Sequence, residues 1–398
     1  PIAAITGTNG KTTTARMLHH IWQVAGYRAG VCTTHGVWVG DDLVTSANLS
    51  GYPGGHMLLT DPTVEAAVIE MPRKGLIYFG HPGDYYDVAA VLNVQDDHLG
   101  VDGVDTLDTM ARLKAGVLAR ARDAVVVNAD DALCLEMLPH VGKQRHLLVA
   151  RNEGNPALRS HLAQGGEAVF ICPQQGVRWI VLAYGAKLEP IMPVADIPAT
   201  MGGLLAFNEM NAMFAMAMAH AQGVAPATIR RAMGGFVNSP AANAGRYNFI
   251  EGFPFQVLLD YAHNPDGARG LCELVRSLPV TGRRLLVCLN LGNRFARHLR
   301  VVAPIIASTF DYFVLGVDAK RAGKSADYAG PDPTGAMLNC FHDEMRAAGV
   351  SPAAMFSEPD ELTAIKLGLA MAQPGDLLVL LAEPDLALPL LTLNTRPC

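Results

Sequence analysis

The first half of the chain alternates short apolar runs with segments in which apolar residues recur at helical spacing. This alternation is typical of parallel βαβ units. Helices are predicted over Thr12–Ala25, which Gly26 ends, and over Asn208–Gln222. Four runs that are apolar along their length predict buried strands: Ile2–Ile5, Ala67–Met71, Val88–Val94 and Ala124–Asn128.

Residues 143–200 depart from this pattern because they are richer in Gly and Pro. Their short alternating runs, Ala168–Cys172 and Trp179–Leu182, predict extra antiparallel strands within the first domain. The stretch from Asn238 to Gly245 consists of small, loop-prone residues and predicts a linker.

The alternation of strands and helices restarts after this linker. It predicts a second, smaller α/β domain of the doubly wound, Rossmann-like type. We therefore expect two domains, 1–240 and 241–398, of which the first has a mostly parallel sheet. The strands predicted for the second domain are Gln256–Asp260, Leu285–Leu289, Tyr312–Val317 and Leu377–Leu381.

Composition excludes several classes of protein. Of the 398 residues, 50% are hydrophobic and 17% are charged, which is ample for buried cores. The formal net charge of −6 argues against a nucleic-acid backbone as the main partner. The most apolar stretch, Asp376–Leu393, is interrupted by two acidic residues and two prolines. No run reaches the roughly 20 residues of a spanning helix, so we expect no membrane partner.

The seven cysteines are scattered and include no CxxC pair, which disfavours a zinc cage or a disulfide framework. We expect them to be core thiols in a reducing cytoplasm. The chain has no initiator Met and opens inside an apolar run, so we expect a segment cut from a longer polypeptide.

The strongest chemical signal is the run T-G-T-N-G-K-T-T-T, which lies between the first strand and the first helix. Glycines let a backbone approach phosphate oxygens, and a helix N-terminus presents N–H groups to an anion. Lys11 can reach the β- and γ-phosphates, and the Thr12 hydroxyl can ligate Mg²⁺. The spacing GxxxxGK[ST] is not met, because Ile5 stands where its first Gly belongs. We therefore interpret the run as a shorter P-loop. The alternative is an incidental Gly-rich turn. The residues of the P-loop are Gly7, Thr8, Asn9, Gly10, Lys11, Thr12 and Thr13.

Two further side chains follow strands that we expect to flank this loop. Glu70 ends one predicted strand, and His98 follows another. Ligands of parallel sheets bind at the carboxyl ends of the strands, so both residues can converge on Lys11. Oxygen ligands suit a cation that bridges phosphates, and His is a permissible addition. Taken alone, Glu70 can be an exposed strand-end carboxylate and His98 a surface histidine.

Lys114 stands out within a predicted helix. It falls inside the apolar stripe of that helix, whereas Arg112 lies on the opposite face. A lysine in such a stripe must snorkel, pair with a carboxylate, or lose its charge. A neutral amine can react with CO₂ to give a carbamate, which would be an oxygen ligand for Mg²⁺. The residues of the stripe are Leu107, Met110, Leu113, Val117 and Leu118.

These motifs together resemble the Mur ligase superfamily of ATP-dependent ligases, which join a carboxylate to an amino acid. Within it, the chain is most similar to the C-terminal, Mur-like half of the cyanophycin synthetases. The resemblance covers nearly the whole chain. Besides the P-loop, it is carried by Asp97-His98-Leu99, Asn128-Ala129-Asp130-Asp131, Asn208 with Asn211, Gly245-Arg246, and the run from Asp260 to Pro265.

The resemblance implies a P-loop central ATPase domain and a Rossmann-like C-terminal domain. It also implies an acyl-phosphate intermediate, with no enzyme nucleophile. Lys11, His98, Lys114 and Arg246 would be catalytic. Thr12 and Glu70 would hold one Mg²⁺, and His98 with a carbamylated Lys114 a second. Asn208 would contact the adenine of ATP, Asp260 its ribose and Arg246 its phosphates.

Several positions depart from the family pattern, which leaves the substrates open. The usual Glu-Thr-Ala-Arg-Gly-Gly reads E-M-P-R-K-G from Glu70, and Thr-Thr-Asp-Gly reads T-T-H-G from Thr33. The acidic residues of a Gly-Asp-Arg-Arg-Asp run are absent from residues 292–296. A carboxylate acceptor and an amino acid are the expected substrates, with a homo-oligomer left open and an N-terminal ATP-grasp portion outside this chain. The alternatives are another Mur-type ligase, with a peptidoglycan- or folate-type acceptor, and a non-catalytic nucleotide-binding scaffold.

Overall fold

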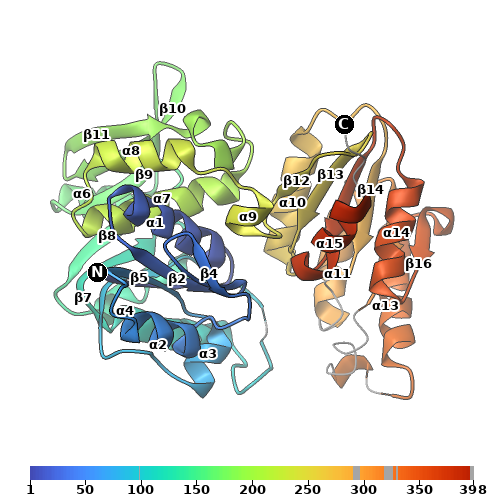
Figure 1. Ribbon diagram of the computed structural model, residues 1–398, viewed down its shortest axis with the longest axis horizontal. Helices are drawn as coiled ribbons and strands as arrows, with labels where there is room; N and C mark the ends of the chain where they lie inside the picture. Colours follow the sequence, from blue (N-terminus) through green and yellow to red (C-terminus); the bar gives the residue numbers. More distant parts are fainter. Residues whose placement is uncertain (98, 290–295, 318–325, 329, 395–398) are drawn as a thin grey trace. The chain divides into compact units, whose positions relative to one another are not determined.

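The protein is described here by a computed structural model that covers residues 1–97, 99–289, 296–317, 326–328 and 330–394 (Figure 1). It divides into two compact units, Pro1–Val237 and Asn238–Cys398. Both are layered α/β structures, as the alternating pattern predicts.

Unit 1 is built on one sheet, in which the order is β11-β10-β9-β8-β7-β6-β1-β5-β2-β3-β4. The strands from β9 to β2 in this order are parallel, and the strands beyond them at both ends pair antiparallel. The strands are β1 (Ile2–Thr6), β2 (Ala29–Thr33), β3 (Gly36–Val39), β4 (Asp42–Thr45), β5 (Ala66–Glu70), β6 (Tyr86–Val91), β7 (Ala121–Asn128), β8 (Arg145–Ala150), β9 (Glu167–Gln174), β10 (Val177–Tyr184) and β11 (Lys187–Pro193).

Helices cover both faces of this sheet (Figure 1). Helices α1, α7 and α8 pack on one face, and α2 to α6 contribute to the core of the other. The helices are α1 (Lys11–Val24), α2 (Tyr52–Thr60), α3 (Arg73–Tyr78), α4 (Leu107–Leu118), α5 (Ala132–Leu135), α6 (Pro156–Ala163), α7 (Ala206–Ala221) and α8 (Pro226–Gly235), with 3₁₀ turns η1 (Leu138–His140), η2 (Val194–Asp196) and η3 (Pro198–Thr200).

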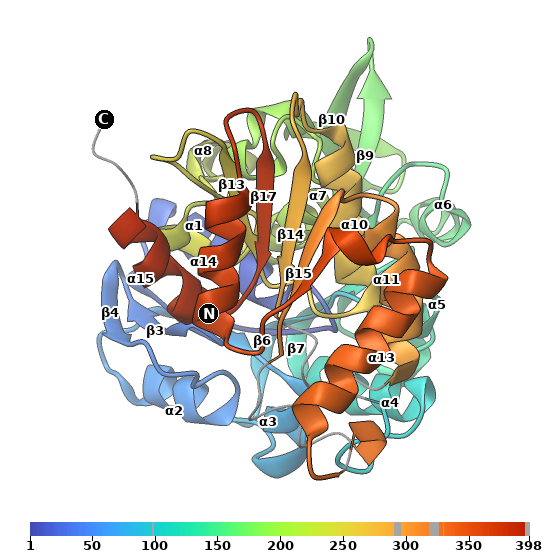
Figure 2. The same ribbon diagram turned by 90° about the vertical axis from the view of Figure 1, so that its right-hand side faces the viewer.

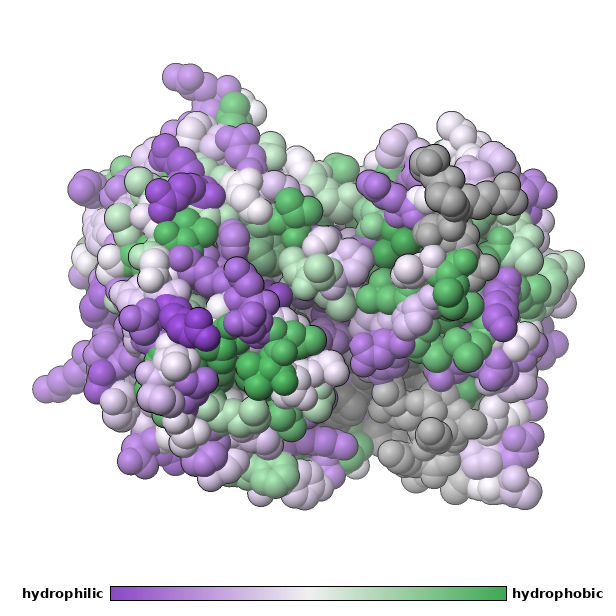
Figure 3. Space-filling view, in the orientation of Figure 1, coloured by the Kyte–Doolittle hydropathy of each residue, from purple (hydrophilic) through white to green (hydrophobic). Residues whose placement is uncertain are grey.

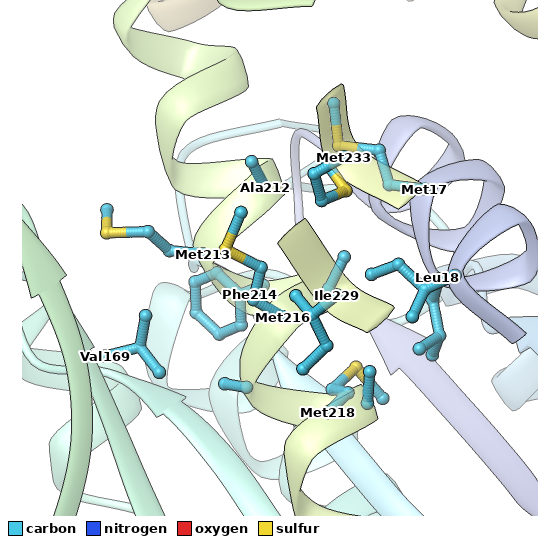
Figure 4. Close-up of a cluster of buried hydrophobic side chains, with 14 of the residues drawn as sticks. Met17, Leu18, Val169, Ala212, Met213, Phe214, Met216, Met218, Ile229 and Met233 are labelled. Carbon is cyan, nitrogen blue, oxygen red and sulfur yellow. The ribbon is translucent and has the colours of Figure 1, made fainter. Parts of the chain in front are cut away.

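The buried strands alternate their side chains between two cores. In β1, Ala3 and Ile5 belong to the core beneath α1 and α7, whereas Ala4 belongs to the opposite one. Methionines from α1, α7 and α8 fill the first core, as Figure 4 shows around Phe214 and Ile229. Unbranched Met side chains fit irregular gaps between helices. These two cores fix the strand ends at which the P-loop is mounted.

Unit 2 has a sheet of order β12-β13-β17-β14-β15-β16, in which only β12 pairs antiparallel (Figure 2). Its strands are β12 (Asn248–Ile250), β13 (Gln256–Asp260), β14 (Arg284–Cys288), β15 (Tyr312–Leu315), β16 (Met355–Ser357) and β17 (Leu377–Leu381). Its helices are α9 (Pro240–Asn243), α10 (Pro265–Ser277), α11 (Ala296–Ala307), α13 (Pro333–Ala347), α14 (Glu361–Met371) and α15 (Pro384–Asn394), with turns η4 (Ala326–Tyr328) and η5 (Pro352–Ala354).

The segment predicted as a loop-like linker contains the short helix α9. The side chain of Ser239 accepts a hydrogen bond from the Ala242 N–H at 3.2 Å, and Pro240 takes the first helical position. A serine N-cap followed by proline starts a helix even where the other residues are small.

The surface of unit 1 in Figure 3 is mostly hydrophilic, with an apolar area near β4. Leu43 and Val44 of β4 are 52% and 51% exposed. Among the described residues, no helix is both long and apolar enough to cross a membrane.

Candidate active site

The P-loop follows β1 directly and ends in α1. Gly10 has φ +88°, a left-handed conformation that favours glycine, and a Cβ there would collide with the Asn211 side chain. A Cβ at Gly7 would stand 2.9 Å from Cβ of Leu92. The two glycines are therefore required by close packing as well as by backbone shape.

Lys11 is the first residue of α1, and its side chain turns back over the loop. Its Nζ donates to the carbonyl oxygens of Gly7 and Thr8, at 3.0 and 2.9 Å. The ammonium group is thereby held beside the loop that would surround a phosphate.

Glu70 lies beside the P-loop, as expected for the end of the neighbouring strand. In the sheet register Ile5 pairs with Glu70, so the carboxylate stands level with the end of β1. The Thr12 hydroxyl donates to Glu70 Oε2 at 2.9 Å. Glu70 is only 2% exposed, so the reading as an exposed carboxylate is wrong.

Thr34 completes this arrangement and was not predicted as a site residue. Its hydroxyl donates to Glu70 Oε1 at 3.1 Å, and its N–H donates to Oε2 at 3.1 Å. The cluster of Thr12, Glu70 and Thr34 offers one carboxylate and two hydroxyls. Such hard oxygen donors fit Mg²⁺, which usually takes one or two carboxylates together with substrate phosphates and water.

Lys114 lies in the middle of α4 and is only 2% exposed. The burial expected from the helical pattern is thus found, and Arg112 on the opposite face is 72% exposed. Burial, and after it the charge of Lys11, lower the pKa of Lys114, the charge of Asp97 opposes them, and the resulting pKa is about 7. Helix α4 packs against β1, the strand that leads into the P-loop. A neutral amine is therefore accessible near neutral pH.

The second predicted metal site is only partly described. His98 lies outside the described residues, and its predicted role stays a prediction. Among the described residues, no group of three or more His, Cys, Asp or Glu side chains could hold a metal ion. A metal at the P-loop would therefore rely on hydroxyl, phosphate and water oxygens besides Glu70.

Two asparagines connect α7 to the P-loop. Asn208, predicted to contact adenine, is 1% exposed; it donates to the Ala199 carbonyl at 2.8 Å and accepts from Asn211 at 3.1 Å. Asn211 packs on Gly10 and accepts from the Thr14 hydroxyl at 3.3 Å. Of the two, Asn211 is the one in contact with the loop, a role that helical spacing from Asn208 does not reveal.

Arg246 and Asp260 belong to unit 2 and stand near each other within it. Asp260 ends β13, and its two carboxylate oxygens accept the N–H groups of Tyr247 and Ala262, at 2.9 and 2.7 Å. Burial raises the pKa of Asp260 to about 6, and the charge of Arg246 acts in the opposite direction. The Arg246 guanidinium lies 5.2 Å from the centre of the Tyr261 ring.

Comparison with known proteins gives two family matches. The Mur ligase middle domain matches residues 5–219, and the Mur ligase glutamate ligase domain matches residues 245–383. The cyanophycin synthetase of Geminocystis herdmanii (strain PCC 6308) is 33% identical over 96% of this chain and 42% of its own length. The chain therefore spans less than half of that relative. A UDP-N-acetylmuramoyl-L-alanyl-D-glutamate–2,6-diaminopimelate ligase of Geobacillus thermodenitrificans (strain NG80-2) is 26% identical over 95% of this chain and 73% of its own.

Solved structures share the two-domain fold. E. coli FolC in complex with DHPP and ADP matches with a TM-score of 0.66 and 18% identity, over 99% of this chain and 89% of its own. A folylpolyglutamate synthase/dihydrofolate synthase from Yersinia pestis c092, complexed with AMPPNP and Mn ion, matches with a TM-score of 0.64 and 19% identity. The match covers 95% of this chain and 85% of that one. From the two domain matches and the cyanophycin synthetase similarity, we conclude that the chain belongs to the Mur ligase family, whose members are ATP-dependent ligases.

Proposed function

We propose that the chain forms an amide bond between a carboxylate acceptor and an amino acid at the expense of ATP, in the manner of a cyanophycin synthetase. The observation that carries this proposal is the P-loop lysine beside a buried Thr12–Glu70 pair at adjoining strand ends. The 33% identity to cyanophycin synthetases supports the same class of reaction.

In this mechanism an acceptor carboxylate oxygen attacks the γ-phosphorus, and ADP leaves. The amine of the amino acid then attacks the carbonyl carbon of the acyl phosphate, and inorganic phosphate leaves. Lys11 would leave the Gly7 and Thr8 carbonyls to neutralise the transferred phosphoryl group. Catalysis by positioning and charge neutralisation needs no nucleophile from the protein.

Thr12, Glu70 and Thr34 would hold Mg²⁺, which would supply charge neutralisation for the phosphates. We propose that Lys114 becomes a carbamate and, together with His98, serves a second Mg²⁺. The lowered pKa of Lys114 supports this, because the neutral amine is the form that reacts with CO₂. In unit 2, we assign Asp260 to the ribose and Arg246 to the phosphates by resemblance to the family.

Similarity to cyanophycin synthetases favours an aspartyl acceptor, and the chain's departures at Pro72, Lys74 and His35 fall next to Glu70 and Thr34. A peptidoglycan-type acceptor is the second candidate, because a diaminopimelate ligase matches 95% of the chain. We place the reaction in the cytoplasm, where ATP and amino acids are available.

An acceptor labelled with ¹⁸O in its carboxylate tests the proposed chemistry. Attack through a carboxylate oxygen carries that atom into the released phosphate, so one ¹⁸O per phosphate is expected. The Lys11→Ala variant is the control and should release little phosphate of either kind. Phosphate free of the label would mean that water attacks ATP directly, and would overturn the acyl-phosphate mechanism.

A further inference from the structure

Asn93 lies just beyond β6, and its side chain is bonded to both the N–H and the carbonyl of one P-loop residue, Asn9. Its side-chain Oδ1 accepts the N–H groups of Thr8 and Asn9, at 2.9 and 2.8 Å. Its Nδ2 donates to the Asn9 carbonyl at 3.1 Å, and its backbone carbonyl also accepts the Thr8 N–H at 3.1 Å. One side chain thus fixes the middle of a loop that has no regular secondary structure of its own.

The loop is also bonded to the segment just after Asn93. The Gln95 N–H donates to the Thr8 hydroxyl at 3.0 Å. Residues 93–95 therefore lie along Thr8 and Asn9, and their hydrogen bonds hold the part of the loop ahead of Gly10.

A second set of hydrogen bonds holds the segment around Asn93 in place. Asn128 Nδ2 donates to the Leu92 carbonyl at 2.7 Å, and Asp131 Oδ2 accepts the Val94 N–H at 2.8 Å. Asn128 and Asp131 belong to the Asn128–Asp131 run, which the sequence singles out but the proposed chemistry does not use. The run anchors the two residues that flank Asn93.

We propose that Asn93 is a positioning residue that holds the P-loop in its nucleotide-accepting shape, with Asn128 and Asp131 as its supports. This inference rests on the proposed ATP site. A loop ordered in advance loses less conformational freedom when a nucleotide binds, so its affinity is higher. The neutral amide suits the role, because a charged side chain at this place would repel a triphosphate or compete with it.

The test uses the whole chain and four variants. Asn93→Ala removes all three side-chain bonds, and Asn93→Ser is a second variant whose hydroxyl is too short to span both N–H groups. Asn93→Asp keeps an acceptor oxygen for Thr8 and Asn9. Asn155→Ala is the matched control, because the Asn155 amide bonds the same Asn128–Asp131 run at the Ala129 carbonyl and Asp130, whereas the bonds to residues 92 and 94 come from Asn128 and Asp131.

Affinity for a non-hydrolysable ATP analogue with Mg²⁺ is measured by titration, well below each melting temperature. We expect Asn93→Ala and Asn93→Ser to bind about tenfold more weakly, which corresponds to about 1.4 kcal/mol. Asn155→Ala should melt earlier yet bind with unchanged affinity. Amide hydrogen exchange at Thr8 and Asn9 should accelerate in Asn93→Ala and remain slow in Asn93→Asp.

Wild-type affinity in both Asn93→Ala and Asn93→Ser, with protected Thr8 and Asn9 amides, would overturn the inference and leave the ATP site intact. Equal weakening in Asn155→Ala would also overturn it, because the effect would then be one of general stability. A wild-type chain that binds no nucleotide would instead overturn the proposed function together with the inference.

Discussion

The Thr12 hydroxyl donates a 2.9 Å hydrogen bond to Glu70 across 58 positions of sequence. Parallel pairing of β1 and β5 makes this contact, since Ile5 and Glu70 are partners in the register. Thr34 bonds both oxygens of the same carboxylate. These hydrogen bonds fix the orientation of the buried Glu70 carboxylate, and we expect that orientation to determine how Mg²⁺ binds.

Glu70→Gln should weaken Mg²⁺ binding and lower turnover by about 10²-fold or more, because the neutral amide cannot balance the cation. Activity is followed as a function of Mg²⁺ concentration, and the concentration for half-maximal rate should rise. Glu65→Gln is the matched control, since the Glu65 carboxylate bonds the Arg28 N–H elsewhere in the unit. An unchanged Mg²⁺ dependence in Glu70→Gln would contradict the assignment.

Lys11→Ala should lower turnover by about 10²-fold or more through lost neutralisation of the γ-phosphate. The fold should persist, because the Lys11 ammonium donates to carbonyls of its own loop, those of Gly7 and Thr8. Circular dichroism and melting temperature check the fold, and Lys187→Ala, at an exposed position of β11, is the control. Normal turnover in Lys11→Ala would rule out the P-loop as the ATP site.

Lys114→Ala should abolish most ligation if the lysine acts as a carbamate. Formate or acetate should restore part of the activity by occupying the space of the lost carboxylate. In the wild type, ¹³C NMR with ¹³CO₂ should show a carbamate signal that the variant lacks. Arg112→Ala, on the exposed face of the same helix, should behave as wild type. Full activity of Lys114→Ala without any added anion would refute the role.

The lowered pKa of Lys114 also predicts how stability varies with pH. Between about 7 and 10.5 the unfolded lysine holds a proton that the folded lysine has lost. The free energy of unfolding should therefore rise with pH across this window. Lys114→Met should lack that contribution, so the difference between the two proteins is measured by denaturant unfolding in CO₂-free buffer. Parallel curves from pH 7 to above 10 would show that the lysine is not desolvated.

The sequence predicts the strands that are marked by a continuous run of apolar residues. Ile2–Ile5, Gln256–Asp260 and Leu377–Leu381 are runs buried on both faces, and they appear as β1, β13 and β17. The short strands β2, β3 and β4 are not among the predicted strands. Gly30 lies inside β2, Gly36 begins β3, and Gly40 lies between β3 and β4, so no apolar run marks them. The helix at residues 240–243 was not predicted, because its formation depends on a single N-cap, Ser239, and not on a periodic apolar pattern.

The site was predictable only where a motif or a period marks a residue. The glycines and Lys11 are marked by the P-loop motif, and the burial of Lys114 follows from the 3.6-residue period. Thr34 reaches Glu70, and Asn93 and Asn211 reach the P-loop, through long-range pairing of strands and helices, which a local pattern does not contain. Their contacts depend on sheet order, with β6 and β5 on either side of β1.

The central claim is that ATP is consumed only to join two substrates. The most direct measurement is phosphate release from ATP with Mg²⁺, in a matrix of the twenty amino acids against aspartyl and glutamyl peptide acceptors. We predict release that requires one acceptor and one amino acid together, and that Lys11→Ala abolishes. Release at the same rate without an amino acid, or nucleotide binding with no release for any pair, would contradict the ligase and favour an ATPase or a scaffold.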